Sequence, residues 1–269
     1  MFHSPFIIEP GTKVQLSHID PGDTRDLRDK DQGKAELKQI RKDIRDLQER
    51  LFAGHQQSLL VILQATDTGG KDGTIKDVFK GVNQQGCRVT SFREPTPEEL
   101  DHDFLWRIHR HTPSKGMIGV FNRSQYEDVL VVRVKHLVAE SVWSQRFNAI
   151  NEFEKRLSEN GTRILKFYLH ISKDEQKERL QARLDNPDKH WKFSKGDLAD
   201  RELWDDYQVA FEDAISRCST AHAPWFVIPA NHKWARNVFI ARTVRAALED
   251  MNPQFPEQTD DLSGIVIPD

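Results

Sequence analysis

Residues 58–74 read SLLVILQATDTGGKDGT and place a short apolar run directly before a glycine-rich turn. The run Ser58–Ala65 has the composition of a strand buried on both faces of a parallel sheet. The turn leads into residues 71–82, which we expect to form a helix. A strand, a glycine-rich turn and a helix in this order are the setting of a phosphate-binding loop.

The turn has the chemistry that phosphate binding requires. Glycines let successive backbone N–H groups point at one anion, and the N-terminus of the following helix adds partial positive charge. Lys71 supplies a mobile point charge. We therefore predict that phosphate is bound by Thr68, Gly69, Gly70, Lys71, Asp72, Gly73 and Thr74. The alternative is a plain strand-to-helix turn with Asp67 or Thr68 as its N-cap.

Three residues of the turn depart from the usual pattern. Ala65 stands where a glycine normally begins the motif, and Asp72 stands where a hydroxyl would hold magnesium. Asp67 places a carboxylate inside the loop, where it would repel phosphates unless a metal ion lies between them. We therefore predict Mg²⁺ as a cofactor and Asp67 as one of its ligands.

Further apolar runs along the chain alternate with helical patterns. The other four predicted strands are Cys87–Phe92, Met117–Phe121, Arg163–Ile171 and Trp225–Ala230, and the remaining predicted helices cover about 32–54, 97–111, 125–138, 142–159 and 232–251. This alternation predicts one α/β domain with a five-stranded parallel sheet covered by helices on both faces.

The parts outside this alternation have their own patterns. Residues 1–31 read as an extended arm, residues 252–269 as a tail, and the charged, helical segment 173–219 as a lid. Within 32–54, apolar residues recur at three- and four-residue steps, which predicts a helix that packs either on the core or on another subunit.

Composition excludes several classes of protein. The 269-residue chain has a net charge of −3, so no overall field draws it to nucleic acid or to anionic lipid, and neither is a predicted partner. Its only cysteines, Cys87 and Cys218, are predicted to be free thiols. No signal peptide precedes the domain and no apolar stretch approaches the roughly 20 residues that span a bilayer, so we predict a cytoplasmic protein.

A second group of candidate residues follows the third strand, at residues 122–128 (NRSQYED). Ligands bind at the carboxyl ends of strands in an open α/β sheet, and this segment resembles a Walker B motif with Asn122 in place of its aspartate. Arg123 is placed to bridge two phosphate groups. Either Glu127 or Asp128 could complete the metal shell, and we predict Asp67, Asn122 and Asp128 as metal ligands. The predicted catalytic residues are Asp67, Lys71, Asn122, Arg123 and Asp128.

Basic residues gather in two further places. Arg107 and Lys115 follow the second helix, and Arg179, Arg183 and Lys192 lie in the predicted lid. We predict that these five bind phosphate, although for any single lysine a solvated helix face is the alternative. Acidic residues interrupt both clusters, so they do not form the long basic stripe of a nucleic-acid-binding protein.

These motifs together resemble the polyphosphate kinase 2 family over about residues 32–256. The segment 67–73 (DTGGKDG) resembles its variant Walker A motif and 121–128 (FNRSQYED) its Walker B segment, whereas 190–193 (HWKF) and 204–207 (WDDY) resemble its lid. Asn122 and residues 125–128 are similar to the subgroup called class III. The resemblance implies a P-loop kinase fold related to thymidylate kinases, a polyphosphate channel, magnesium dependence and a homo-oligomer, either a dimer or a tetramer.

The resemblance also implies an activity, namely phosphoryl transfer between inorganic polyphosphate and AMP or ADP, with ATP as a product. Guanine nucleotides stay open as further substrates. Two alternatives are an ATP-dependent nucleoside monophosphate kinase of the same fold and a nucleotide- or RNA-binding protein without catalysis. A pure binder has no use for magnesium-positioning carboxylates beside Lys71, which disfavours the latter.

Overall fold

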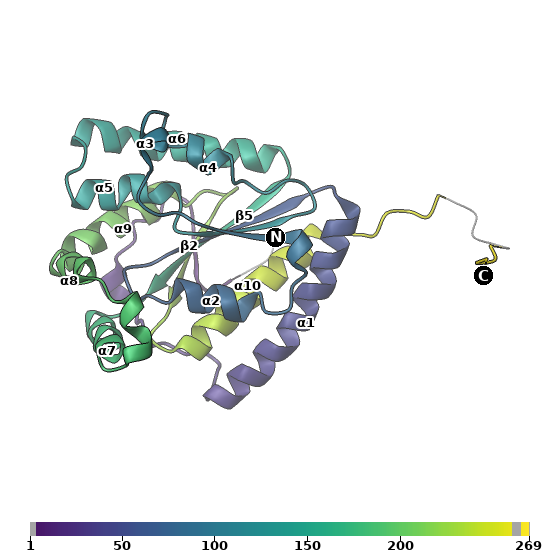
Figure 1. Ribbon diagram of the computed structural model, residues 1–269, viewed down its shortest axis with the longest axis horizontal. Coiled ribbons are helices and arrows are strands. Elements are labelled where there is room, and N and C mark those ends of the chain that lie inside the picture. The colour runs from purple at the N-terminus through teal and green to yellow at the C-terminus, as the bar shows by residue number, and fades with distance from the viewer. Residues whose placement is uncertain (1–3, 260–264, 269) are drawn as a thin grey trace.

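The protein is described by a computed structural model, which covers residues 4–259 and 265–268. One sheet lies at its centre, with strands in the order β1-β6-β5-β2-β4-β3 (Figure 1). The strands are β1 (Ile7–Ile8), β2 (Ser58–Gln64), β3 (Cys87–Ser91), β4 (Ile118–Asn122), β5 (Thr162–His170) and β6 (Trp225–Pro229). Neighbouring strands are parallel except β1, which runs antiparallel to β6.

The five predicted parallel strands are confirmed, each within one residue at either end. The prediction of a five-stranded, wholly parallel sheet is wrong at one edge, because the N-terminal arm adds β1. Ile7 pairs with Phe226 and Ile8 with Trp225. A two-residue strand is too short to show a period in the sequence. The arm also buries Phe6, Leu16 and Leu27, so much of it packs on the domain.

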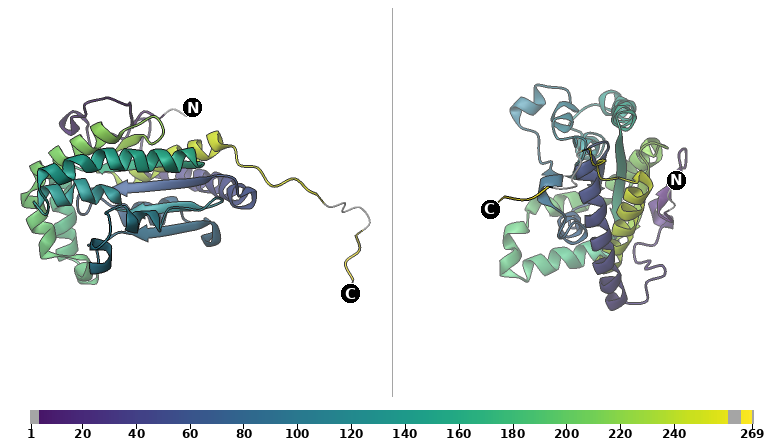
Figure 2. Two further views of the ribbon diagram at one scale, coloured as in Figure 1. Left: turned by 90° about the horizontal axis from the view of Figure 1, so that it is seen from above. Right: turned by 90° about the vertical axis from the view of Figure 1, so that its right-hand side faces the viewer.

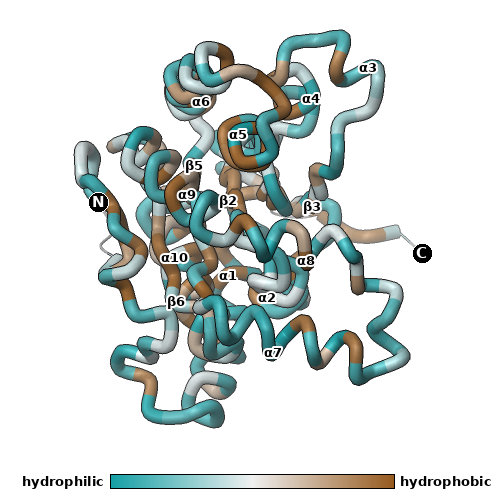
Figure 3. The backbone as a smooth tube through the Cα atoms, turned by 90° about the vertical axis from the view of Figure 1, so that its left-hand side faces the viewer, coloured by the Kyte–Doolittle hydropathy of each residue, from teal (hydrophilic) through white to brown (hydrophobic). Residues whose placement is uncertain are grey.

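Helices cover both faces of the sheet because the side chains of β2 alternate between them. Leu59, Val61 and Leu63 face one layer, whereas Leu60 and Ile62 face the other. The first layer consists of α1 (Lys30–Gly54), α2 (Lys71–Val78) and α10 (Lys233–Met251), and the second contains α5 (Val131–Val134), α6 (Glu140–Glu159) and α9 (Trp204–Cys218) (Figure 2). Hydrophobic segments concentrate between these layers and along α5, as the brown parts of the tube show (Figure 3).

The apolar stripe predicted for the first long helix is confirmed, and its packing partner lies in the same chain. Leu37, Ile40 and Ile44 are buried against the core, and α1 lies along α10. The two helices approach closely at Gly33, where an added Cβ atom would lie 2.7 Å from the ring of Trp234. The stripe therefore belongs to the core of one subunit.

Two of the predicted helices are interrupted. Residues 97–111 form α3 (Pro97–Leu100) and α4 (Trp106–His109), and residues 125–138 form the 3₁₀ helix η3 (Gln125–Val129) followed by α5. Asp103 accounts for the first interruption, because its carboxylate accepts the backbone N–H of Leu105 and turns the chain. Two shorter 3₁₀ helices are η1 (Leu16–His18) and η2 (Gln84–Gly86).

The predicted lid segment 173–219 divides into two parts. Its first part holds α7 (Lys173–Leu184), the 3₁₀ helix η4 (Pro187–Lys192) and α8 (Lys195–Glu202), at the opposite end of the molecule from the tail (Figure 1). Its second part is α9, whose Ala210, Phe211 and Ile215 are buried in the core. Only residues 173–203 therefore have the features of a lid, because α9 belongs to the core.

The predicted C-terminal tail is described at 252–259 and 265–268, where it has no regular secondary structure and extends away from the body (Figures 1 and 2). Within these ranges and the rest of the described chain, no helix combines the length and hydropathy needed to cross a membrane. The two cysteines carry no disulfide, as predicted.

We expect Gly33→Ala to destabilise the protein, although alanine normally stabilises a helix by up to about 1 kcal/mol relative to glycine. The added methyl group would press on the Trp234 ring, and overpacking of this kind costs about 1–3 kcal/mol. The measurement is the free energy of urea unfolding. In a Trp234→Leu background the same change should be neutral or stabilising. A stabilising Gly33→Ala in the natural background would show that α1 and α10 are less closely packed.

Candidate active site

The glycine-rich turn joins β2 to α2 at the carboxyl edge of the sheet, as predicted. Its backbone enters the left-handed region at Thr68 (φ +61°) and at Gly70 (φ +99°), which caps α2. Gly69 is needed for a different reason, because a Cβ atom there would lie 2.4 Å from that of Ala65. The loop is therefore tightly curled, and its glycines permit the curl.

Side chains from behind the loop bind its carbonyl oxygens. The four hydrogen bonds run from Lys71 Nζ to Ala65 O (3.0 Å), from Gln176 Nε2 to Asp67 O (3.2 Å), from Arg179 Nη1 to Thr68 O (3.0 Å) and from Arg236 Nη1 to Gly69 O (3.3 Å). A peptide plane whose carbonyl is held on one side presents its N–H to the other. The N–H of Gly69 donates to Thr66 O at 3.1 Å, so the arrangement leaves the amides of Thr68 and Gly70 for an anion.

Arg179 and Arg236 are buried cations in this arrangement. Arg179 also donates to Ala230 O, to Asn231 O and to the Glu175 carboxylate. Burial, together with the nearby charge of Arg179, lowers the pKa of Arg236 to about 9. Arg179 therefore belongs mainly to the scaffold of the loop, with three of its hydrogen bonds on backbone carbonyls. It also borders a basic cavity of about 420 Å³ beside the loop, so phosphate binding by Arg179 stays a prediction.

Three threonine hydroxyls at the loop have no hydrogen-bond partner within the described residues. They belong to Thr66, Thr68 and Thr74, and Thr74 is fully buried. Buried hydroxyls normally find a partner, because an unmet one costs about 1–3 kcal/mol. Orphaned hydroxyls around a curled, amide-rich loop indicate that a polar ligand completes the site.

Arg123 links the two predicted motifs. Its guanidinium lies 3.0 Å from the Asp67 carboxylate and 3.6 Å from that of Glu127. Glu127, and then Asp67, raise the pKa of Arg123 above its ordinary value. Arg123 also has φ +63°, a left-handed conformation that costs a non-glycine residue about 1–2 kcal/mol. The predicted proximity of Asp67, Asn122 and Arg123 is thus observed.

Asp128, by contrast, does not reach this group. Its carboxylate pairs with Arg146 at 2.9 Å, and burial raises its pKa to about 6. The turn of η3 points Glu127 at Arg123 and Asp128 toward α6. Both acids were candidates from the sequence and Asp128 was the one predicted as a ligand, but the geometry favours Glu127, so the choice of Asp128 needs correction.

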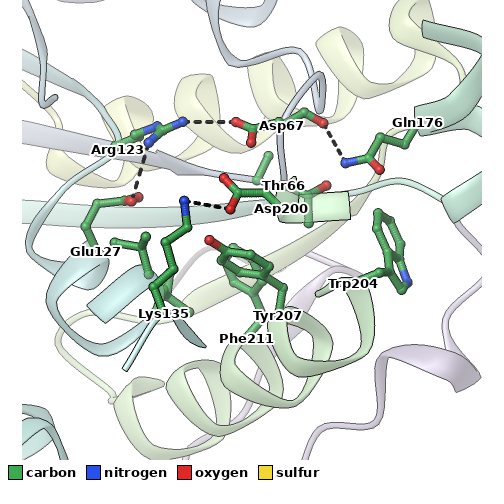
Figure 4. A pocket seen from close by; sticks show the side chains of 13 residues that line it. Thr66, Asp67, Arg123, Glu127, Lys135, Gln176, Asp200, Trp204, Tyr207 and Phe211 are labelled. Carbon is green, nitrogen blue, oxygen red and sulfur yellow. Dashed lines mark hydrogen bonds and ion pairs between the residues drawn. The ribbon is translucent and has the colours of Figure 1, made fainter. Parts of the chain in front are cut away.

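Two cavities meet at Asp67 and Arg123. The loop cavity, of about 510 Å³, is lined by residues 67–73, Asn122 and Arg123, together with Arg183 and Lys192 from the segment 173–203. The side cavity lies across Asp67 and Arg123 and is lined by Glu127, Lys135, Gln176, Asp200, Trp204, Tyr207 and Phe211, among others (Figure 4). The side cavity is much smaller, at about 90 Å³, so Asp67 and Arg123 border a large cavity on one side and a small one on the other.

The other predicted basic residues divide between the site and the scaffold. Arg183 and Lys192 line the loop cavity, with Arg183 also paired to Asp197 at 3.0 Å, and their binding of phosphate stays a prediction. Arg107 is only 5% exposed and donates to Arg93 O, so it supports a neighbouring loop. Lys115 precedes β4, at the amino edge of the sheet, opposite the phosphate loop. The phosphate-binding assignments of Arg107 and Lys115 need correction on these grounds.

Lys71 begins α2 and lies close to both motifs. Burial, and secondly the charge of Arg123, lower its pKa to about 8. Asp72 is exposed and accepts a hydrogen bond from Asn122 Nδ2 at 2.7 Å, with Lys192 at 3.9 Å. This hydrogen bond connects the start of α2 to the end of β4. The amide oxygen is then the remaining polar atom of the Asn122 side chain.

Sequence reasoning missed two residues of the site and gave a third no role of its own. Arg236 lies in α10, the helix that follows the fifth parallel strand, and Lys135 lines the side cavity from the end of α5. A usable signal existed for Arg236, because residues that follow each parallel strand gather at the same edge of the sheet. None existed for Lys135, because helix packing alone brings it there. Tyr207 of α9 was noted only within the segment 204–207, and it also lines the side cavity.

The residues present suit a divalent metal that is held mostly by its substrate. No group of three or more His, Cys, Asp or Glu side chains gathers as a metal cage anywhere in residues 4–259 and 265–268. Mg²⁺ is usually bound through one or two carboxylates together with phosphate oxygens and water. Asp67 and Glu127, with the amide oxygen of Asn122, provide such a donor set.

Comparisons with known proteins agree with this geometry. The polyphosphate kinase 2 family model matches residues 27–256. An AMP/ADP-polyphosphate phosphotransferase from Meiothermus ruber is 51% identical over 97% of this chain and 98% of its own, and an ADP-polyphosphate phosphotransferase from Rhodopseudomonas palustris is 44% identical over 80% and 78%. The crystal structure of polyphosphate kinase 2 from Arthrobacter aurescens has a TM-score of 0.93 at 45% identity, covering 97% of this chain and 94% of that one. The predicted P-loop kinase fold is thereby confirmed.

Arg179→Ala and Arg183→Ala should differ sharply in stability. The first leaves three backbone carbonyls without their donor, at about 1–3 kcal/mol for each that stays buried. The second removes an ion pair whose side chains are 24% and 16% exposed, and one hydrogen bond to the exposed Lys192 O, for a total of about 1 kcal/mol. Urea unfolding of the two variants measures the difference. Equal losses would contradict the assignment of Arg179 to the scaffold.

Proposed function

This chain belongs to the polyphosphate kinase 2 family, and we propose that it transfers phosphoryl groups between inorganic polyphosphate and the adenine nucleotides AMP and ADP, forming ADP and ATP. It is a polyphosphate-dependent nucleotide kinase. The observation that carries the choice of both acceptors is the near full-length match to a relative named for AMP and ADP. Guanine nucleotides as further substrates stay a prediction, as do the homo-oligomer, whether dimer or tetramer, and the cytoplasmic location.

We propose that the donor's terminal phosphates occupy the loop cavity. Residues 68–71 line it at the N-terminus of α2, and Arg183 and Lys192 line it as well and add positive charge. The acceptor's phosphate then enters from the side cavity, which Lys135 lines together with Arg123. Lys135 is now paired with Asp200 at 2.7 Å, and an incoming phosphate would compete for it.

Transfer between these positions needs little chemistry from the protein. The attacking phosphate oxygen is already anionic, so no general base is required. Lys71 and Arg123 neutralise charge on the transferring group, and positioning plus electrostatics supply the rate enhancement. Kinases of this family use a divalent metal, which we propose is Mg²⁺ held by Asp67, Glu127 and Asn122. When bound, the metal neutralises phosphate oxygens.

We also propose that α7, η4 and α8 close over the donor as a lid.

Purified protein with ADP, polyphosphate and Mg²⁺ should form ATP, and AMP in place of ADP should yield ADP. ATP offered as the donor to AMP should support a much lower rate of ADP formation than polyphosphate does. Luminescence and chromatography follow the products. A clear preference for ATP as donor would support an ATP-dependent nucleoside monophosphate kinase instead.

Lys71→Ala should lower this rate about 100-fold to 1,000-fold, because loss of one group aimed at transition-state charge typically costs that much. Lys76→Ala is the matched control, since Lys76 is exposed further along α2. Circular dichroism should show that both variants are folded. Near-normal turnover by a folded Lys71→Ala variant would remove Lys71 from the reaction.

The metal dependence should separate the two neighbouring acids. Asp67→Asn and Glu127→Gln should raise the Mg²⁺ concentration needed for half-maximal activity, because each loses a proposed ligand. Asp128→Asn should leave that concentration unchanged, since its carboxylate pairs with Arg146. The measurement is a magnesium titration of initial rate. A shift in Asp128→Asn as large as that in Asp67→Asn would restore Asp128 as a ligand.

A further inference from the structure

The turn that carries Arg123 and Glu127 is backbone-strained yet fixed in place. Arg123 adopts a left-handed conformation while its side chain faces both Asp67 and Glu127. Such a conformation persists only where the surroundings over-determine it. Part of the restraint comes from Leu63 O, which accepts the N–H of Arg123 at 3.1 Å. The rest of the restraint comes from the side chains of the residues that follow Arg123.

A fully buried ion pair lies directly beneath this turn. Lys166 of β5 and Glu154 of α6 are both 0% exposed, with Nζ and Oε2 separated by 2.5 Å. The two other donors of Lys166 are used as well, toward Tyr126 Oη at 2.8 Å and Cys218 O at 2.6 Å. Cys218 ends α9, the helix that supplies Tyr207 and Phe211 to the side cavity.

The second oxygen of Glu154 binds the turn itself. Oε1 accepts hydrogen bonds from Gln125 Nε2 and from Tyr126 Oη, each at 2.9 Å. One residue closer to Arg123, Ser124 Oγ accepts from Gln64 Nε2 at 3.1 Å, and Gln64 is the last residue of β2 before the phosphate loop. Each side chain between Arg123 and Glu127 is thus anchored to a buried partner.

We propose that Glu154 and Lys166 are positioning residues, which act through Gln125 and Tyr126 to aim Arg123 and Glu127 at Asp67. The proposal rests on the function proposed above. An apolar pair of similar volume would fill this part of the core at no greater cost than a buried ion pair. An apolar pair, however, would offer no acceptor to the two side chains of the turn and no donor to the end of α9. The pair therefore joins β5, α6 and α9 to the reactive turn.

The test removes the hydrogen bonds between the turn and the ion pair and leaves Glu154 and Lys166 unchanged. Gln125→Met deletes one hydrogen bond with little change in volume, and Tyr126→Phe deletes the hydroxyl shared by Glu154 and Lys166. Ser58→Ala is the matched control, since it deletes a buried hydrogen bond to Thr162 Oγ1 (2.9 Å) at the opposite edge of the sheet. All are assayed for ATP formation from ADP and polyphosphate, beside the natural protein and well below their unfolding temperatures.

Both turn variants should lose about 10-fold to 100-fold in kcat, the range expected when reacting groups are displaced by about 1 Å. The Michaelis constants for ADP and polyphosphate should change less than about threefold, because Arg123 acts mainly in the transition state. The magnesium requirement should rise as Glu127 shifts. Ser58→Ala should keep its kcat while losing comparable stability. Hydrogen exchange should quicken at residues 123–130 in the turn variants alone.

Turn variants that match Ser58→Ala in kcat, magnesium requirement and exchange at 123–130 would overturn the proposal, leaving the pair a feature of the core. If Gln125→Met fails to fold, Tyr126→Phe decides the question alone, because it keeps the ring against Trp225 and the ion pair intact. Failure of the natural protein to use polyphosphate would count against the proposed function. Even then, hydrogen exchange at residues 123–130 would test whether the ion pair positions the turn.

Discussion

Two buried arginines determine the shape of the phosphate loop, and the remainder of the site depends on that shape. Arg179 and Arg236 bind the carbonyl oxygens of Thr68 and Gly69 and so hold the loop in its curled form. Both guanidiniums are largely buried, and both also border a basic cavity of about 420 Å³ beside the loop. Their charges still lie beneath the loop, where burial reduces solvent screening and strengthens the positive potential. Gly70 is constrained by the same contact, because a side chain there would meet Arg236.

The charged side chains in front of the loop form ion pairs with one another, and bound substrates would change these pairs. Arg123 binds Asp67 and Glu127, Lys135 binds Asp200, and Arg183 binds Asp197. Each pair holds a cation close to where a phosphate would lie, at little net charge. A phosphate accompanied by a divalent metal can take the arginine or lysine while the metal takes the carboxylate. Binding and catalysis then draw on the same residues, as electrostatic stabilisation of phosphoryl transfer requires.

The sequence predicted the parallel strands and the phosphate loop because both depend on local pattern. A continuous apolar run and a glycine-rich turn are legible without knowledge of packing, as at Ser58–Thr74. Whether Glu127 or Asp128 faces the site depends on how the 3₁₀ helix η3 is rotated about its axis, which the sequence did not reveal. Arg107 and Arg179 were assigned to phosphate because they are cations near the motifs, but burial against backbone carbonyls gives them structural roles. Lys135 was missed because only helix packing brings it to the cavity.

The proposed mechanism of phosphoryl transfer depends on where the donor's phosphates bind. A crystal structure of the protein with a short polyphosphate and Mg²⁺ measures this directly. We expect phosphate oxygens within hydrogen-bonding distance of the amides of Thr68, Gly70 and Lys71, with Asp67 and Arg123 at the terminal phosphate. Density for the polyphosphate elsewhere, for example beside Arg163 and His222 at the opposite edge of the sheet, with the loop vacant, would contradict it.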